Sequence, residues 1–354
     1  MAVSRLPMKN ILKYCLSLAI AGGLMWYVFK DMDLAAMWAK FENANHWWLI
    51  LVTLFTIIAA WSRAYRWNML LEPLGFKPSS FDSTVAVFTG YFANQLIPRA
   101  GEVTRCGTLN RLERVPVNVS FGTVVAERVF DVISLLALIG LAFILEFNRL
   151  SDFFMRLFGE KLGMGSGNGS GRIVLLGGVA VLGIGIAVAA WWFYRNNAER
   201  LRQNSLFAKI EGFVLGLVEG LLSVRKLRNP WAFVFHTVLI WTMYLLSSYV
   251  CFFVLPESSH LTLLAGLTVL IMSGLGMSAP VQGGIGPYHI LVSSALVLYG
   301  LSKEDGLALA TYIHGTQMIL MLLLGGISFI ITLVKSPKAE SQTSLSHSIS
   351  NKNV

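Results

Sequence analysis

The sequence predicts an all-α protein that crosses a membrane several times. Of its 354 residues, 55% are hydrophobic and only 13% are charged, whereas soluble domains carry roughly 25% charged residues. About 20 helical residues cross a hydrocarbon core of roughly 30 Å. Six apolar runs are long enough for a full span, at 11–29, 47–64, 118–145, 172–194, 231–254 and 307–334.

The distribution of basic residues orients these spans. With the N-terminus inside, 20 of the 28 Lys and Arg residues fall in cytoplasmic segments and 7 on the opposite side. This positive-inside pattern places both termini in the cytoplasm, so the net charge of +9 needs no nucleic-acid partner. The first run could also be a signal peptide cleaved after "AIA", but it stays apolar through Phe29, which favours an uncleaved helix.

Two further apolar stretches, 81–97 and 262–279, are interpreted as arms of hairpins, because counting either as a crossing would invert every later loop. The first stretch breaks at "PRAG" and the second at "APVQGGIGP", and each is followed by another helical run. A break at membrane depth is tolerated where it is buried in protein or lines a wet cavity. We expect re-entrant hairpins at about 81–115 and 262–300, inserted from opposite sides as in inverted-repeat transporters.

These segments also admit a plainer interpretation. The stretch 81–97 could be a short amphipathic helix before an ordinary loop, and "QGGIG" a tight turn between two short spans. The agreement of the breaks with the charge pattern favours hairpins. Around them we expect a single transmembrane domain over 1–335, with a cytoplasmic amphipathic segment at about 205–228, and a disordered cytoplasmic tail at 336–354.

The two breaks carry residues suited to an anion. Gly283, Gly284 and Gly286 can take positive φ and let backbone N–H groups converge into a nest that favours anions. In the first break, Gly101 and Glu102 open the return helix. Both hairpins would then direct the positive ends of helices at the protein centre.

Charged side chains extend this lining. Arg99 and Arg105 add positive charge, and Glu102 shares a helix face with Arg105. We therefore expect an anionic head group, a phosphate or a carboxylate, to bind there.

Three ionisable residues, Glu127, Arg128 and Asp131, lie early in the long apolar run 118–145. Charged groups in such a run are functional candidates by default, because they are costly unless paired or wet. They could instead snorkel to the cytoplasmic interface. We favour pairing with Arg99 or Arg105.

Histidines and a polar stripe complete the candidates. His289 lies in the first turn of a return helix, where it could read the substrate by hydrogen bonding or carry a proton. His314 and Gln317 belong to a stripe with three-residue spacing on the last span, although a membrane His is often only a packing residue.

Some features are interpreted as structural. At the inner end of the second span, Arg63, Arg66 and Trp67 are interpreted as interface anchors. The three cysteines lack CxxC spacing, and nothing indicates a metal site, a cofactor or a catalytic residue.

Three ordered motifs, "NQLIPRAGEVTR", "ERVFDVISLL" and "APVQGGIGPYH", resemble the flippase-like transmembrane family that includes the membrane part of lysylphosphatidylglycerol synthases, the multiple peptide resistance factors. The resemblance covers roughly residues 8–335. It implies a bacterial inner-membrane protein that moves a lipid between leaflets. By position, the motif residues fall on Asn94, Pro98, Arg99, Gly101, Glu102, Arg105, Glu127, Arg128, Asp131, Pro280, Gly283, Gly284 and Gly286.

The chain departs from the family pattern in two ways. Many relatives have Glu where this chain has His289, which affects the expected substrate charge or coupling. About 20 mostly polar residues follow the last span, so we expect no soluble aminoacyl-transferase domain after it.

The leading functional hypothesis is a non-enzymatic lipid flippase whose partners are membrane lipids, either an anionic phospholipid or a lipid-linked substrate. One alternative is a membrane-embedded lipid-modifying transferase, with Glu102, Asp131 or His289 as base. Another is a non-transporting partner of a separate cell-envelope enzyme.

Overall fold

The computed structural model describes residues 22–30, 32–97, 99–147, 149, 227–279 and 281–336, and its regular elements there are helices. The chain forms two compact units, Met1–Arg128 with Arg225–Val354, and Val129–Val224. In the second unit, the described residues continue one long helix, with Glu146 paired to Arg149 at its end.

Four described helices are long and apolar enough to cross a membrane, which confirms a multi-pass helical membrane protein. They are α3 (Trp48–Leu71), α6 (Val117–Leu145), α10 (Pro230–Val250) and α13 (Lys303–Val334). Each matches a predicted span. Of the remaining predicted spans, 11–29 is described only from residue 22, where it is helical to residue 29, and 172–194 lies outside the described residues.

Shorter helices separate these spans in two similar series. A pair of short helices, α4 (Ser80–Leu96) and α5 (Gly101–Glu113), lies between α3 and α6. A second pair, α11 (Leu263–Ser278) and α12 (Pro287–Leu298), lies between α10 and α13. The smaller elements are α2 (Leu34–Glu42), η1 (Glu72–Leu74), η3 (Cys251–Phe253), η4 (Pro256–Ser258) and η5 (Gln282–Gly284).

The first break forms because local chemistry stops α4 and restarts the helix within four residues. Ile97 is extended (φ −134°, ψ 119°), as expected before a proline. The Asn94 side-chain oxygen accepts a hydrogen bond from the Gly101 N–H at 2.7 Å, which caps the start of α5. A Cβ on Gly101 would lie 2.5 Å from the Gly90 carbonyl oxygen, so α4 and α5 pack closely only with glycine there.

The second break uses glycine for a different reason. Gly283, Gly284 and Gly286 have φ of 59°, 70° and 95°, as predicted. Pro287 then begins α12, where its missing N–H costs no hydrogen bond. The arms also pack closely, because a Cβ on Gly276 would lie 2.6 Å from the Cα of Tyr288.

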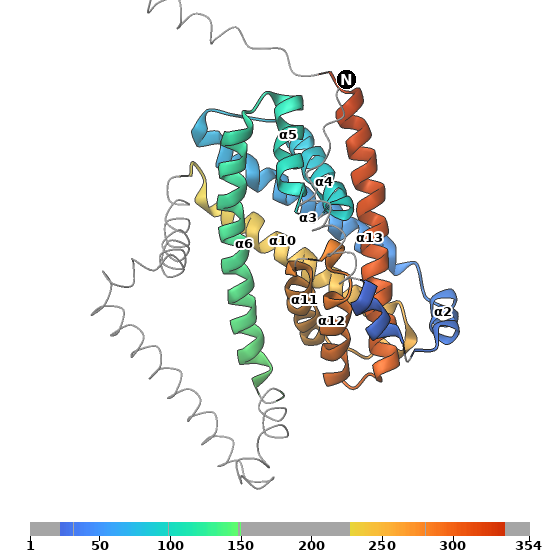
Figure 1. Ribbon diagram of the computed structural model, residues 1–354. Coiled ribbons are helices and arrows are strands. Elements are labelled where there is room, and N and C mark those ends of the chain that lie inside the picture. The colour runs from blue at the N-terminus through green and yellow to red at the C-terminus, as the bar shows by residue number, and fades with distance from the viewer. Residues whose placement is uncertain are drawn as a thin grey trace, which may run out of the picture. The chain divides into compact units, whose positions relative to one another are not determined.

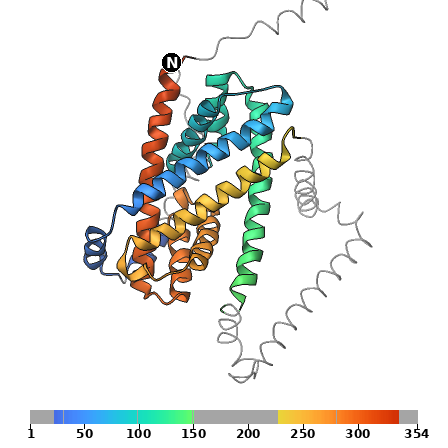
Figure 2. The same cartoon turned by 180° about the vertical axis from the view of Figure 1, so that it is seen from behind.

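Figure 1 shows the two pairs of short helices of the first unit, and each pair contributes to its own hydrophobic core. Residues of α3, α4, α5 and α6 contribute to one core, and residues of α11, α12 and α13 contribute to the other. Helices α3 and α10 lie side by side and antiparallel (Figure 2), since Arg228 pairs with Glu72 at one end and the Asn45 N–H donates to the Val254 carbonyl at the other.

Helix α4 is not a surface amphipathic helix. Eight of its residues, Asp82, Ser83 and Val85 to Gly90, are buried, and it packs against α3, α5 and α13. The first segment therefore forms a helix–break–helix hairpin inside the protein. The predicted amphipathic segment at 205–228 and the predicted tail lie outside the described residues, except for 227, 228 and 336.

Candidate functional site

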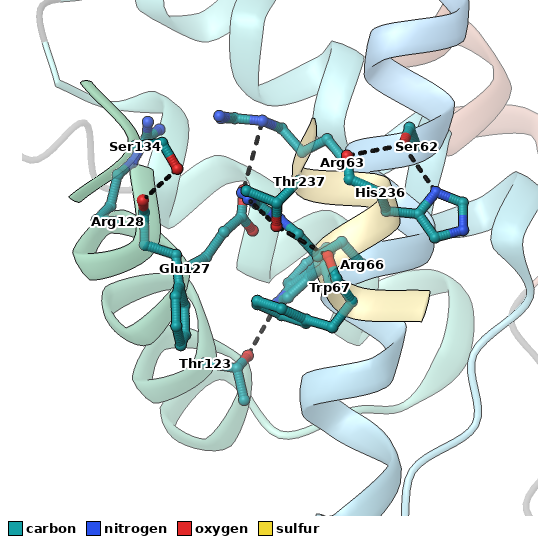
Figure 3. A network of polar contacts seen from close by, with 12 residues as sticks. Ser62, Arg63, Arg66, Trp67, Thr123, Glu127, Arg128, Ser134, His236 and Thr237 are labelled. Carbon is teal, nitrogen blue, oxygen red and sulfur yellow. Dashed lines mark hydrogen bonds and ion pairs between the residues drawn. The ribbon is translucent and has the colours of Figure 1, made fainter. Parts of the chain in front are cut away.

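A buried cluster of charged side chains lies where α3, α5, α6 and α10 meet (Figure 3). Glu127 on α6 is 1% exposed. One of its oxygens lies 3.4 Å from the Nε of Arg63 and 3.4 Å from an Nη of Arg66. The other oxygen accepts a hydrogen bond from Arg105 at 2.8 Å. One carboxylate is therefore shared by three guanidinium groups.

The two arginines of α3 are fixed by the surrounding helices. Arg66 is fully buried, and it also donates to the Thr237 hydroxyl on α10 at 3.2 Å. Its guanidinium lies 5.7 Å from the ring centre of Phe233. Arg63 is 5% exposed.

Arg105 lies against an aromatic ring. Its guanidinium carbon is 3.8 Å from the centre of the Trp67 ring, a distance typical of a cation–π contact. Trp67 is itself buried, and its indole N–H donates to Thr123 at 2.9 Å. The Nε of Arg105 is buried and has no hydrogen-bond partner among the described residues.

This position corrects the interpretation of Arg63, Arg66 and Trp67 as interface anchors. They lie near the end of an apolar run, as anchors do, but α6 and α10 cover that end and bring Glu127 and Thr237 to it. The sequence around Arg63 and Arg66 gives no local signal that other helices pack over this end of α3. The three-residue spacing of the two arginines was the available hint, because it places both on one helix face.

The predicted pairing of Glu127 with Arg105 is confirmed. Glu127 does not snorkel, since it is buried. Glu102 pairs with Arg128 at 2.9 Å, and both side chains are partly exposed. Two ion pairs therefore join α5 to the part of α6 that belongs to the first unit.

The tips of the two hairpins touch. The Gln282 amide donates to the carbonyls of Gln95 and Leu96 at 3.0 and 3.2 Å. The side-chain oxygen of Gln95 is buried there without a hydrogen-bond partner among the described residues. The contact between the breaks that the sequence indicates is therefore present.

The predicted anion nest in the second break is not formed. The Gly284 N–H donates to the Val281 carbonyl at 3.2 Å, and the Gly286 N–H donates to the Nδ1 of His289 at 3.4 Å. Positive φ turns the chain here, but these donors are already used within it. The positive charge described near the hairpins comes from guanidinium groups instead.

Histidines hold the second break to the last span. The Nε2 of His314 lies 2.9 Å from the Gly283 carbonyl oxygen, and its ring stacks on Tyr288 with centres 4.4 Å apart. His289 lies edge-to-face against His314 at 4.9 Å. Tyr288, which is 1% exposed, was not singled out in the sequence, because aromatic residues are common in apolar helices.

Other predicted site residues lie apart from the cluster. Arg99 is exposed in a left-handed conformation (φ 63°) at the first tip. Gln317 is exposed, because three-residue steps drift round a helix of 3.6 residues per turn and do not keep to one face. Asp131 belongs to the second unit. Pro98 and Pro280 lie outside the described residues.

Comparison with known proteins identifies the chain's relatives. A family model described as the lysylphosphatidylglycerol synthase TM region matches residues 14–325. UPF0104 membrane protein MJ1595 of Methanocaldococcus jannaschii is 27% identical over 126 residues, 35% of this chain and 36% of that protein. UPF0104 membrane protein PH1989 of Pyrococcus horikoshii is 22% identical over 335 residues, 90% of this chain and 96% of that protein.

The match to a third relative covers only part of that protein. Glycosyltransferase AglD of Haloferax volcanii is 25% identical over 296 residues, which are 78% of this chain but 47% of that protein. The chain thus spans less than half of MJ1595 and of AglD. No solved structure matches it significantly.

Proposed function

Because the chain belongs to the family of the lysylphosphatidylglycerol synthase transmembrane region, we propose that it moves an anionic lipid between the leaflets of a membrane. The lipid's head group binds beside the arginine cluster, defined as Arg63, Arg66 and Arg105 around Glu127. The two hairpins enter from opposite sides, so that their touching tips lie at membrane depth. No catalytic step is assigned to the chain.

The observation that carries this proposal is the state of Arg105. The residue is 4% exposed, yet its buried Nε donor has no acceptor among the described residues. A buried donor without an acceptor costs about 1–3 kcal/mol, and more when it is charged. A phosphate oxygen would satisfy that donor. Charged groups kept within apolar helices are functional candidates for the same reason.

The test uses the full chain in phosphatidylcholine vesicles with fluorescently labelled phosphatidylglycerol, whose transfer is followed by quenching from outside. Arg105→Gln removes the donor and the charge. We expect it to slow transfer about tenfold or more, because a charge-assisted hydrogen bond is worth about 1.5–3 kcal/mol. Arg105→Lys should recover only part of the rate, since an ammonium has no guanidinium fork.

The matched control is Arg228→Gln. Arg228 is an arginine of the same unit, but its side chain is 78% exposed and pairs with Glu72. Its variant should transfer lipid within about twofold of the wild-type rate, because an exposed ion pair is worth at most about 1 kcal/mol. Equal rates for the wild type and Arg105→Gln would contradict the proposal.

A second candidate is a non-transporting partner of a cell-envelope enzyme, and the likeness to part of a protein named a glycosyltransferase supports an association with such chemistry. It predicts that a stoichiometric enzyme co-purifies and that the chain alone moves no lipid. A transferase would instead release modified lipid when purified protein meets candidate donors. Mass spectrometry of the vesicle lipids separates these outcomes.

A further inference from the structure

His289 and His314 form a buried pair that the arginine cluster does not use. They are 3% and 2% exposed, and their ring centres lie 4.9 Å apart. His314 comes from the span α13, whereas His289 comes from the first turn of α12. The pair therefore joins a membrane span to the break of the second hairpin.

The hydrogen bonds of the pair indicate where each ring carries its proton. The Nε2 of His314 faces the Gly283 carbonyl, which can only accept, so this nitrogen bears the hydrogen. The Nδ1 of His289 accepts from the Gly286 N–H, so the hydrogen of that ring lies on Nε2. A proton added to His289 at Nδ1 would face another donor. A proton added to His314 at Nδ1 leaves the bond to Gly283 intact.

The described surroundings of the pair contain no carboxylate. The Tyr288 ring stacks on His314, and Phe29 lies edge-on to His289 at 6.0 Å. Lys30, next to Phe29, lies over the rings of Trp26 and Tyr27. Helix α11 has no ionisable side chain, and Gln95 of α4 is the polar group at the touching tip.

The charged side chains that bond to α13 lie toward its two ends. Glu102 and Arg105 of α5 pair with α6, and the Nδ1 of His46 lies 2.6 Å from the Tyr312 hydroxyl. Asp305 precedes His314 by nine residues, about 13 Å along the helix, and Lys335 follows it by 21 residues, about 31 Å. The residues at the first end are Lys40, Glu257 and Asp305, and those at the second are Asp82, Arg111 and Lys335. A proton on His314 would therefore bring positive charge to a part of the protein that lacks a nearby anion among the described residues.

A bound head group would supply that anion. Along α4, Gly90 packs against Arg105, and Gln95, five residues later, contacts the second break. Five residues rise about 7.5 Å, a length comparable to a lipid head group. A head group held at Arg105 would have to extend along α4 by this length to reach the tip that His314 holds.

We propose that His314 takes up one proton from water, on Nδ1, when the anionic head group binds, and returns it when the lipid leaves. Lipid movement would then be linked to proton movement, which rests on the proposed function. His289 limits uptake to one proton, because two cations 4.9 Å apart in a poorly solvated site repel strongly. The stacked Tyr288 ring favours the imidazolium by a cation–π contact.

The test measures binding of dihexanoyl phosphatidylglycerol to the purified full chain by calorimetry between pH 5.5 and 8. Its phosphodiester does not titrate in this range. Paired buffers of different ionisation enthalpy give the number of protons taken up. We expect up to about one proton per lipid, and an affinity that weakens by up to about tenfold per pH unit between the titration ranges of the free and the lipid-bound protein.

Variants assign the proton to a residue. His314→Gln should bind the lipid with a pH-independent affinity and without proton uptake, whereas His260→Gln, which changes an exposed histidine, should behave as the wild type. Proton uptake retained in His314→Gln would overturn the assignment. If that variant does not fold, as judged by gel filtration, the buffer comparison on wild-type protein still decides whether a proton binds.

The two proposals fail differently. Lipid binding by the wild type without proton uptake overturns the proton inference and leaves the anion site intact. If the wild type does not bind this lipid, and if lipids that co-purify with it are the same in Arg105→Gln, the anion site itself is wrong.

Discussion

At the scale of the residue, Glu127 is the most sensitive position of the arginine cluster, because one buried carboxylate serves three guanidinium groups. Glu127→Gln keeps the shape but removes the charge. Breaking a buried ion pair by removing one partner costs about 3–5 kcal/mol. We expect a loss of this size, measured by thermal unfolding of the purified protein in detergent.

The matched comparison is Glu102→Gln, on the helix that also carries Arg105. Glu102 pairs with Arg128, but the two side chains are 30% and 44% exposed. Exposed ion pairs are worth about 0–1 kcal/mol, so this variant should unfold close to the wild-type temperature. Equal losses of stability in Glu127→Gln and Glu102→Gln would show that burial does not determine the cost of breaking these ion pairs.

The arginine cluster shows which contacts of single residues could be predicted from the sequence and which could not. The pairing of Glu127 with Arg105 could be predicted, since buried charges need partners and few were available. The places of Arg63 and Arg66 could not, because a charged residue near the end of a span looks the same whether lipid or protein surrounds it. The prediction of an anion nest was wrong, because N–H groups of the glycine-rich turn find acceptors within the turn and the following helix.

At the scale of the element, close packing of α4 on α5 depends on two glycines. In Gly101→Ala, the new Cβ would lie 2.4 Å from the Asn94 side-chain nitrogen and 2.5 Å from the Gly90 carbonyl oxygen. The arms must then separate, at a cost of about 1–3 kcal/mol. Gly107→Ala on the same helix meets nothing within 4 Å and should stabilise the protein by up to about 1 kcal/mol.

Chemical denaturation in detergent distinguishes these two alanine variants, and opposite signs are expected. Two variants with the same sign would mean that helix propensity, rather than packing between the arms, controls the hairpin. The helices themselves were predictable, because apolar length and Gly or Pro interruptions are local signals. The close approach of Gly276 to Tyr288 was not, since it depends on how two arms cross.

At the scale of the whole molecule, the proposed insertion fixes which loops face which side. Single cysteines introduced at Lys77 and Arg114 should react with a membrane-impermeant maleimide only from the cytoplasmic side, and one at Asn43 only from outside. All three positions are exposed. Cys106 and Cys251 are buried, and all three native cysteines would be replaced by alanine first. Labelling of Lys77 and Asn43 positions from one side would contradict the opposed hairpins.

The contacts of α13 have a mechanical consequence. Phe92 of α4 presses on Gly325, where an added Cβ would come within 2.7 Å, and Ser293 of α12 lies against Gly306, 19 positions earlier. The same helix, α13, therefore packs against one arm of each hairpin. Neither arm can shift by one helical turn without displacing α13 or losing this packing. A displacement of one hairpin would thereby be transmitted to the other through α13.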